Sequence, residues 1–502
     1  MKYCFLLCLL LTLLCRPQAA TLHVGAGYAY ANLSQAVAAV QPGDTIEMHA
    51  GIYAGGLYFA NLQGTAAQWI TLRGAAGEEA VLQGGNNAVQ LSDPAYLRIV
   101  GLIFRQQTGN GVNVDDGGSY SSPAHHIVFE RCTFRDMNAS GNNDLLKLSG
   151  LDHFEVRECR FLNGAAGGSG IDMVGCHYGL IRYNYFENQG SNSIQAKGGT
   201  AYVRMEGNTF VDGGQRTLNL GGSTGLQFFR PDTAHYEAAH LQVYANTFVG
   251  SWAPIAYVGS VHVEVVNNTF YAPENWVIRI LQETVDTSRF LACGDNSFVN
   301  NIVYLDRLLN TETNIGPNTR PQSFTFSHNL WFQAASANWL GPKIPSPDAF
   351  QIVQADPLFL SPGDYSFQIQ PHSPAAGRGK TVSDPAFDVL KRLYNQPRSI
   401  GAAEANPLSA VHEGTVAEAG WLISPNPCEG QVLLSGRLAQ AGQVQAWLYD
   451  VAGRTIKYWQ SGHYEAGQIQ WMLALEMPLG LYWLRWQAGE AVVIRPVYVV
   501  GR

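Results

Sequence analysis

The stretch SIQAKGGTAYVRMEGNTFVDGGQRTLNLGG (193–222) decides the fold, because it contains one complete unit of a repeat. At its centre is an Asn followed two residues later by an aromatic side chain. The same pattern, with Cys or Asn first, recurs in RCTF (131–134), ECRF (158–161), YNYF (183–186), GNTF (207–210), ANTF (245–248), NNTF (267–270) and HNLW (328–331). From Cys132 the intervals are 27, 25, 24, 38 and 22 residues, a period typical of a solenoid, and the interval of 38 contains an insertion.

A second strand recurs with the same period. Its segments are LLKLS (145–149), GIDMV (170–174), SIQAK (193–197), TLNLG (217–221), PIAYV (254–258) and VIRIL (277–281). Successive side chains of a strand point to opposite faces, so two apolar columns should face inward. One runs from Leu146 to Ile278 and the other from Leu148 to Ile280. The sequence therefore predicts an all-β protein, a right-handed parallel β-helix over 21–404, in which stacked asparagines form a ladder at one turn.

The two ends of this region fit a β-helix. Residues 32–48 predict an amphipathic helix and a strand that cap the first coil. This opening, with GDTIEMHAGIY (43–53), resembles the start of secreted pectate-lyase-like β-helix proteins. ADPLFLSPGDYSFQIQPHSPAAG (355–377) and RSIGAAEA (398–405) resemble the closing segment of bacterial β-helix proteins. The five cysteines after residue 20 lack any CxxC pair, which argues against a zinc site or a dense disulfide scaffold, and Cys132 and Cys159 are expected to pack within the ladder.

The remaining segments indicate export. Residues 1–20 predict a signal peptide, and no second apolar run is long enough for a membrane span. Removal of this peptide changes the net charge from −8 to −10, which disfavours nucleic-acid binding. Residues 405–420 are expected to be a linker and 421–502 a small β-sandwich. The latter resembles the C-terminal sorting domain of the type IX secretion system through SPNP (424–427), YDVAGR (449–454) and LGLY (479–482), which implies that machinery as a partner and a secreted or cell-surface location.

The polar residues between the two apolar columns should form one outward stripe. It contains Lys147, Asp172, Gln195, Asn219, Ala256 and Arg279, with Lys197 at the next outward position. Coils about 4.8 Å apart give a stripe of about 24 Å, a length that suits a polymer. The insertion 222–240 leaves the same edge, and its Phe229 and Tyr236 either line a groove for sugar rings or close the loop onto the solenoid.

This stripe suggests β-elimination on a uronic-acid sugar, which needs carboxylate neutralisation, a base and a proton for the departing oxygen. Lys197 is the candidate base, with Arg216 as its cationic neighbour. Lys147 is a second candidate base, or else a salt-bridged rung with Asp172. His177 is either an acid–base group or a structural hydrogen-bonding residue. Arg279 and Glu283 either bind substrate or form a surface ion pair.

The central coils also resemble the β-helix lyases that include alginate lyases and chondroitinase B. The resemblance implies a base at Lys197, an Arg one coil later and acids that hold calcium. This chain has Asn219 at the Arg position, and Ser193 and Gln195 replace the acids. NDLLKLSG, GIDMVGCH and IQAKGG together resemble bacterial proteins described only as right-handed parallel β-helix proteins.

The sequence leaves three functions open. The first is a lyase acting on an acidic polysaccharide, the second a non-catalytic cell-surface glycan binder, and the third a glycoside hydrolase, which would need paired carboxylates. Calcium stays open as a cofactor, with Asp115 and Asp116, or Asp144 and Asp172, as oxygen ligands, and a solvated turn is the alternative for the first pair. We expect a monomer.

Overall fold

The computed structural model describes residues 19–119, 121–405, 422–424, 428, 430–438, 440–450, 454–475, 477–478, 480–488 and 491–499. Nearly all of the predicted signal peptide (1–20) and linker (405–420) lies outside these residues. The described residues form two compact units, one within 1–382 and 388–405, the other within 383–387 and 406–502.

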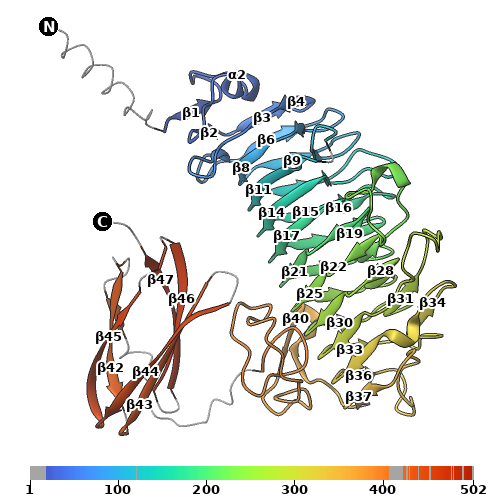
Figure 1. Cartoon of the computed structure of the whole chain (residues 1–502), viewed down its shortest axis with the longest axis vertical. Helices are drawn as coiled ribbons and strands as arrows, with labels where there is room; N and C mark the ends of the chain where they lie inside the picture. The colour runs from blue at the N-terminus through green and yellow to red at the C-terminus, as the bar shows by residue number, and fades with distance from the viewer. Residues whose placement is uncertain are drawn as a thin grey trace. The chain divides into compact units, whose positions relative to one another are not determined.

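The first unit is a right-handed parallel β-helix, as predicted, and its coils follow one another from blue to yellow in Figure 1. Three parallel sheets form its walls. Sheet A contains β1 (Thr21–Val24), β2 (Thr45–Met48), β5 (Ile70–Gly74), β8 (Ala95–Val100), β11 (Ala124–Glu130), β14 (Leu151–Arg157), β17 (His177–Arg182), β21 (Arg204–Glu206), β25 (Gln242–Tyr244), β29 (Glu264–Val266), β32 (Ser297–Val299), β35 (Thr325–Ser327) and β37 (Asp348–Ala349), with β20 (Thr200–Ala201), β24 (Ala238–Ala239) and β28 (Ser260–Val261) along one side.

Sheet B contains β3 (Gly51–Ala54), β6 (Ala80–Gln83), β9 (Ile103–Arg105), β12 (Thr133–Arg135), β15 (Arg160–Leu162), β18 (Tyr185–Glu187), β22 (Thr209–Val211), β26 (Thr247–Val249), β30 (Thr269–Tyr271), β33 (Ile302–Leu305), β36 (Leu330–Gln333) and β38 (Ile352–Val353). Sheet C contains β4 (Leu57–Ala60), β7 (Val89–Ser92), β10 (Val112–Asp115), β13 (Leu146–Ser149), β16 (Ser169–Val174), β19 (Asn192–Lys197), β23 (Leu218–Gly221), β27 (Ile255–Val258), β31 (Ile278–Leu281) and β34 (Thr313–Ile315).

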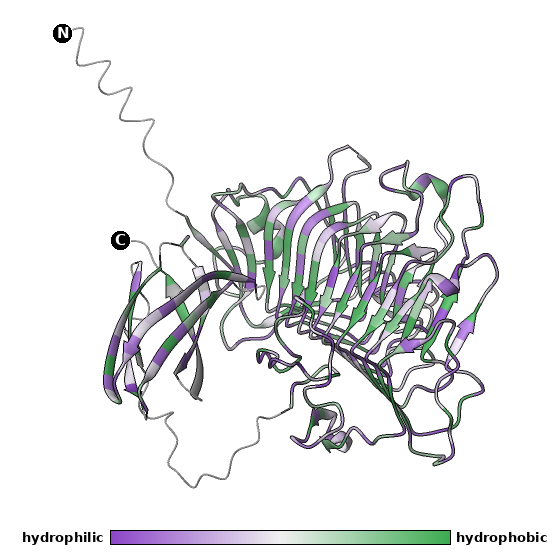
Figure 2. Ribbon diagram, turned by 60° about the horizontal axis from the view of Figure 1, so that its bottom comes forward, coloured by the Kyte–Doolittle hydropathy of each residue, from purple (hydrophilic) through white to green (hydrophobic). Residues whose placement is uncertain are grey.

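The strand register of sheet C confirms the predicted columns. Leu146 pairs with Ile171, and the same column continues coil by coil to Ile278. The second column, from Leu148 to Ile280, is likewise buried. Figure 2 shows apolar and polar residues alternating along strands of this unit. The outward residues are thereby held in line by the packing of their inward neighbours.

The tripeptide repeat forms two ladders at the turn from sheet A to sheet B. Asn184, Asn208, Asn246, Asn268, Asn301 and Asn329 are buried, and each of the first five has its backbone N–H bound by the side-chain oxygen of the next, at 2.8–3.0 Å. Cys132 and Cys159 occupy the preceding rungs as free cysteines. The aromatic residues of the tripeptides stack from Phe134 to Phe270 with centroids 4.6–4.9 Å apart, and Phe104 of β9 extends the stack at 5.0 Å from Phe134. The asparagine ladder therefore supplies hydrogen-bond partners to backbone N–H groups of a turn that is buried from water.

The first coil is capped by the predicted helix, which is short. Helix α2 (Leu33–Val37) begins at Asn32, whose side chain accepts a hydrogen bond from the Gln35 N–H, and it buries Leu33 and Ala36. This cap covers apolar strands that have no preceding coil.

The closing segment runs back along the outside of sheet B. Its strands β39 (Phe359–Ser361) and β40 (Ser366–Ile369) pair with each other, and their aromatic residues pack on Ile302 and Leu330. Asn267 donates to the carbonyls of Ser399 and Gly401. This segment therefore covers one wall of the solenoid and leaves the outward face of sheet C to other residues.

The second unit consists of small antiparallel sheets. One contains β41 (Leu422–Ser424), β42 (Gln431–Leu438) and β45 (Gly467–Ala474), and the other β43 (Gly442–Tyr449), β44 (Thr455–Tyr464), β46 (Gly480–Ala488) and β47 (Ala491–Val499). Several residues of the predicted sorting motifs, including 425–427 and 451–453, lie outside the described residues. Across the residues that the structure describes, no helix has the length and apolar character needed to cross a membrane.

Candidate functional site

The predicted polar stripe lies on the outward face of sheet C. Lys147 pairs in register with Asp172, Asp172 with Gln195, and Gln195 with Asn219. Ala256, Arg279 and Asn314 continue the column. Lys197 stands two residues after Gln195 on β19, on the same face. The structure thus brings together the sequence-predicted residues Lys147, Asp172, Gln195, Lys197, Asn219 and Arg279.

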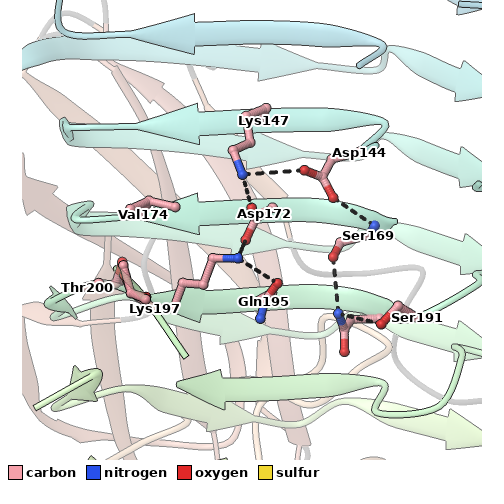
Figure 3. A network of polar contacts seen from close by, with 12 residues as sticks. Asp144, Lys147, Ser169, Asp172, Val174, Ser191, Gln195, Lys197 and Thr200 are labelled. Atoms are coloured by element: carbon pink, nitrogen blue, oxygen red, sulfur yellow. Dashed lines mark hydrogen bonds and ion pairs between the residues drawn. The ribbon is translucent and has the colours of Figure 1, made fainter. Parts of the chain in front are cut away.

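One half of the stripe is an ion-pair cluster built on a buried carboxylate (Figure 3). Asp172 is fully buried, and it binds the Lys147 ammonium on one side and the Lys197 ammonium, 3.4 Å away, on the other. Lys197 also donates to Gln195 Oε1 at 3.2 Å. Lys147 lies 3.5 Å from Asp144, which is 1% exposed. The lysine side chains are 21% and 14% exposed, so the ammonium groups form the outer layer over buried acids.

Two groups of this cluster have shifted pKa values. Burial, together with repulsion from Asp172, raises the pKa of Asp144 to about 6. Burial opposes the charge of Lys147, but attraction to Asp172 and Asp144 outweighs it and raises the pKa of this lysine. Lys147 is therefore held as an ammonium, which supports the salt-bridged rung rather than the alternative of a base. From the sequence, Asp144 is a candidate calcium ligand or hydrolase carboxylate, and its burial has no signal there.

The other half of the stripe gathers two arginines. Arg216 donates to Glu283 Oε1 at 2.7 Å and to Asn219 Oδ1 at 3.3 Å. Arg279 donates to Asn314 and lies 4.7 Å from the ring centre of Trp276. Burial, together with repulsion from Arg216, lowers the pKa of Arg279. Arg216, Arg279 and Glu283 thus form one group beside Asn219, and no contact joins Arg216 to Lys197 among the described residues.

A cavity of about 550 Å³ adjoins this second half. It is lined by Asn188, Gln189, Gly190, Asp212, Gly214, Gln215, Ser251, Trp252 and Glu274. Trp252 is 46% exposed and meets Trp276 edge to face, with centroids 6.1 Å apart. Because Trp276 packs on Arg279, an aromatic wall connects the cavity to the stripe. Trp276 was missed because it belongs to a loop with no repeat pattern.

The structure shows that Phe229 and Tyr236 of the insertion 222–240 do not line a groove for sugar rings. Phe229 is fully buried and packs with Ala234 and Phe290, so it offers no surface to a sugar. Tyr236 is partly buried against Ala201, Ala239 and Val261 of sheet A, away from the stripe. The insertion closes onto the solenoid instead, held by the buried Glu237, which accepts from the Gly198 N–H at 3.0 Å.

The glycines beside the stripe make room for this insertion. A Cβ at Gly199 would lie 2.4 Å from the Arg230 carbonyl oxygen, and one at Gly175 would lie 2.6 Å from the Arg230 Cβ. Both also have positive φ angles. The chain's own loop, rather than a ligand, occupies these positions.

His177 lies at the start of β17 in sheet A and is fully engaged there. Its Nδ1 is 3.1 Å from Asp152 Oδ1 and 2.9 Å from an Arg230 nitrogen, and its Nε2 is 3.1 Å from the Gly199 carbonyl oxygen. Burial opposes the charge of Asp152, but hydrogen bonds from His177 and Arg230 lower its pKa. This geometry supports the alternative that His177 is a structural hydrogen-bonding residue. Through Arg230 it holds the insertion against the solenoid.

Neither acidic pair forms a clear calcium cage. The Lys147 ammonium contacts both Asp144 and Asp172, at the place that a cation shared by the two would need. Asp115 accepts hydrogen bonds from Ser92 and from the Gly117 N–H, and Asp116 accepts from the Gly118 N–H. Asp115 and Asp116 therefore have the contacts of a turn.

Comparison with known proteins agrees with this architecture. The family model described as "Right handed beta helix region" matches residues 87–270. No curated protein matches the chain in sequence. Solved structures similar to it include an alginate lyase from Paenibacillus sp. str. FPU-7 (16% identity, 67% of this chain and 98% of that one, TM-score 0.41) and the pectate lyase Pel9A (14%, 78% and 97%, 0.48).

A further similar structure is the A-module of the mannuronan C-5 epimerase AlgE6 from Azotobacter vinelandii (13% identity, 64% of this chain and 92% of that one, TM-score 0.40). Similarity at this level assigns neither an activity nor a substrate. What the described geometry and the family match show together is a parallel β-helix whose central coils carry a cationic stripe.

Proposed function

We propose that this chain is a carbohydrate-active protein that binds an acidic polysaccharide along the outward face of sheet C and cleaves it by β-elimination. The observation that carries the proposal is the layering of charge. Lys147, Lys197, Arg216 and Arg279 lie along one face, while Asp144 and Asp172 are buried beneath the lysines. At the lysine half a polyanion meets cationic groups first, whereas Glu283 is exposed beside Arg216 in the other half.

The stripe suits a chain of uronic-acid units. Its ammonium and guanidinium groups can pair with the sugar carboxylates, and Trp252 offers a ring face for a sugar unit. Pairing neutralises the carboxylate next to C5 and so acidifies the C5 proton. In elimination this proton leaves, the C4–O bond breaks, a C4=C5 double bond forms and the departing oxygen takes up a proton.

We assign the proton transfer to Lys197. Its ammonium is held 3.4 Å from Asp172, and its side chain reaches solvent at the middle of the stripe. Before the reaction Lys197 must release its own proton to solvent, because only the neutral amine can take the C5 proton. An amine freed of its proton takes the C5 proton, and the resulting ammonium supplies one to the departing oxygen.

A non-catalytic glycan binder is the second candidate, because one observation favours it. Lys197 is paired with a buried carboxylate in the resting structure, which suits a cation that binds substrate better than a base. Asp144 and Asp172 are too deeply buried to flank a glycosidic bond, so the geometry favours the hydrolase least.

The test is to incubate the purified protein with alginate, pectate and glycosaminoglycans, with and without calcium, and follow absorbance from the new double bond. The Lys197→Ala variant should abolish product formation, while Lys343→Ala, far along the chain in a loop, should not change it. A binder instead gives no absorbance in any reaction but retains the polymer in a pull-down, and Trp252→Ala should then weaken retention. A protein that neither binds nor cleaves any of these polymers contradicts the proposal.

We further propose export through the type IX secretion machinery, with the second unit as the sorting domain. The antiparallel sheets of that unit and the sequence motifs around them support this role. Deleting 421–502 should leave the protein inside the cells of a host that carries the machinery, and unchanged release would contradict it.

A further inference from the structure

We propose that His23, Glu47 and His49 form a binding site for a zinc-class divalent metal ion at the first coil of the β-helix. The three side chains come from β1, from β2 and from the residue that follows β2. His23 Nδ1 lies 3.0 Å from His49 Nε2 and 3.3 Å from Glu47 Oε1, and His49 Nε2 lies 4.0 Å from the same oxygen. All three ligand atoms therefore converge on one point.

The spacing suits a metal ion. Zinc–nitrogen bonds of about 2.0–2.1 Å place two ligand atoms about 3.3 Å apart at the tetrahedral angle. Two imidazoles and one carboxylate form a common ligand set for zinc, with the fourth position left for water. His23 is 43% exposed in its side chain, whereas His49 and Glu47 are 14% and 15% exposed, so the ion would enter from the His23 side.

Neighbouring groups fix the ligands in a metal-binding orientation. His49 Nδ1 lies 3.2 Å from Glu78 Oε1, which leaves Nε2 of this ring as the lone-pair nitrogen facing His23. The second oxygen of Glu78 is held by the Ala50 N–H. A carboxylate behind a ligating histidine is the usual outer partner at zinc sites.

Glu47 and the ring of His49 are held from further sides. Arg73 donates to Glu47 Oε2 at 2.7–2.8 Å, so the other oxygen is directed toward the histidines. Tyr28 stacks on the His49 ring, with centroids 3.8 Å apart and planes 6° apart. The charges near the site are two carboxylates and one guanidinium, so a divalent cation meets a net negative surrounding.

The bound ion would join consecutive coils at the end of the solenoid. β1 and β2 pair in sheet A, and Glu78 precedes β6, so the site ties three successive chain passages together. A terminal coil has a neighbour on one side only, and a cross-link there resists fraying. This inference does not depend on the proposed glycan site, which lies in later coils.

The test is metal binding by the purified, metal-stripped protein, measured by isothermal titration with Zn²⁺ and, separately, Ca²⁺. We expect one Zn²⁺ per chain at this site and no competition from Ca²⁺, because imidazole nitrogen favours zinc. His49→Ala should remove this equivalent, and Glu78→Gln should weaken it about 10–100-fold. Co²⁺ in place of Zn²⁺ should give the visible absorption of a tetrahedral site, and His49→Ala should lose it.

His126→Ala is the matched control. His126 also faces another histidine, with Nδ1 2.9 Å from Nδ1 of His125, but no third ligating side chain joins that pair among the described residues. This variant should keep the zinc equivalent. If the full protein binds no Zn²⁺, or if binding persists in both His23→Ala and His49→Ala, the two imidazoles are only hydrogen-bonded and the proposal is wrong. Circular dichroism of each variant shows whether lost binding comes from lost folding.

Discussion

Replacing Asp172 with Asn tests the charge arrangement of the stripe. The substitution keeps the shape of the side chain and removes the buried carboxylate that contacts both lysine ammoniums. Lys147 retains Asp144 at 3.5 Å, whereas the contact left to Lys197 within the described part of the chain is with the neutral Gln195. The variant therefore leaves two neighbouring cations with one partner, and its folded state should be less stable.

The magnitude follows from burial. Removing one partner of a fully buried ion pair costs about 3–5 kcal/mol. The two lysine side chains are partly exposed, and one of them keeps a second acid, so we expect a smaller loss of about 2–4 kcal/mol in the free energy of unfolding. An Asn leaves no cavity, so packing adds little to this value.

Urea unfolding at pH 7 measures this loss, and a double-mutant cycle assigns it. Lys147→Met combined with Asp172→Asn removes one charge of each sign, so the pair should cost less than the sum of the single variants by about 0.5–3 kcal/mol. A loss below about 0.5 kcal/mol for Asp172→Asn, or strict additivity in the cycle, would refute the reasoning.

Three further predictions concern stability. Asn208→Ala should cost about 3–4 kcal/mol in unfolding free energy, because the side chain bonds Asn184, Ile181 and Asn246 inside the ladder. The exposed Asn142→Ala should cost under about 0.5 kcal/mol, and equal losses would contradict the ladder. Burial, together with the neighbouring His125 and His153, lowers the pKa of His126, so the unfolded state binds a proton more readily and stability should fall as pH drops below about 6.5. In thermal unfolding scans His126→Tyr should reduce that fall, and an unchanged pH profile would count against this prediction. The pKa of Asp144 is raised to about 6, so the folded state binds a proton at this carboxyl more readily than the unfolded state does. The contribution of Asp144 to stability should therefore increase as pH falls from above 6 toward 4, and Asp144→Asn should remove that increase.

The sequence was sufficient for the fold and for the register of sheet C. Apolar residues alternating at a period of two, repeated at a near-constant interval, leave one arrangement in which every Leu, Ile and Met is covered. One rung of the ladder was missed at Asn301, because Ile302 and Val303 follow it in place of an aromatic residue. What defines a rung is thus an asparagine that hydrogen-bonds the backbone of a buried turn, and the aromatic residue of the tripeptide pattern does not accompany every such asparagine.

The site could be predicted only where the strand register dictates it. Arg216 meets Glu283 across 67 positions of sequence, through loops that follow no repeat. The burial of Phe229 depends on Phe290, which belongs to another loop. The converging His23, Glu47 and His49 belong to the first coil, where too few repeats precede them to set an alignment. Loop conformation, unlike strand register, has no periodic signal.

Lysine footprinting tests the central claim most directly. The protein is mixed with each acidic polysaccharide, lysines are acetylated, and the extent of labelling at each position is measured by mass spectrometry. We predict that a bound polymer protects Lys147 and Lys197, on the outward face of sheet C, while Lys343 and Lys391 label equally with and without polymer. Protection of Lys343 or Lys391 without protection of the two stripe lysines would contradict the account.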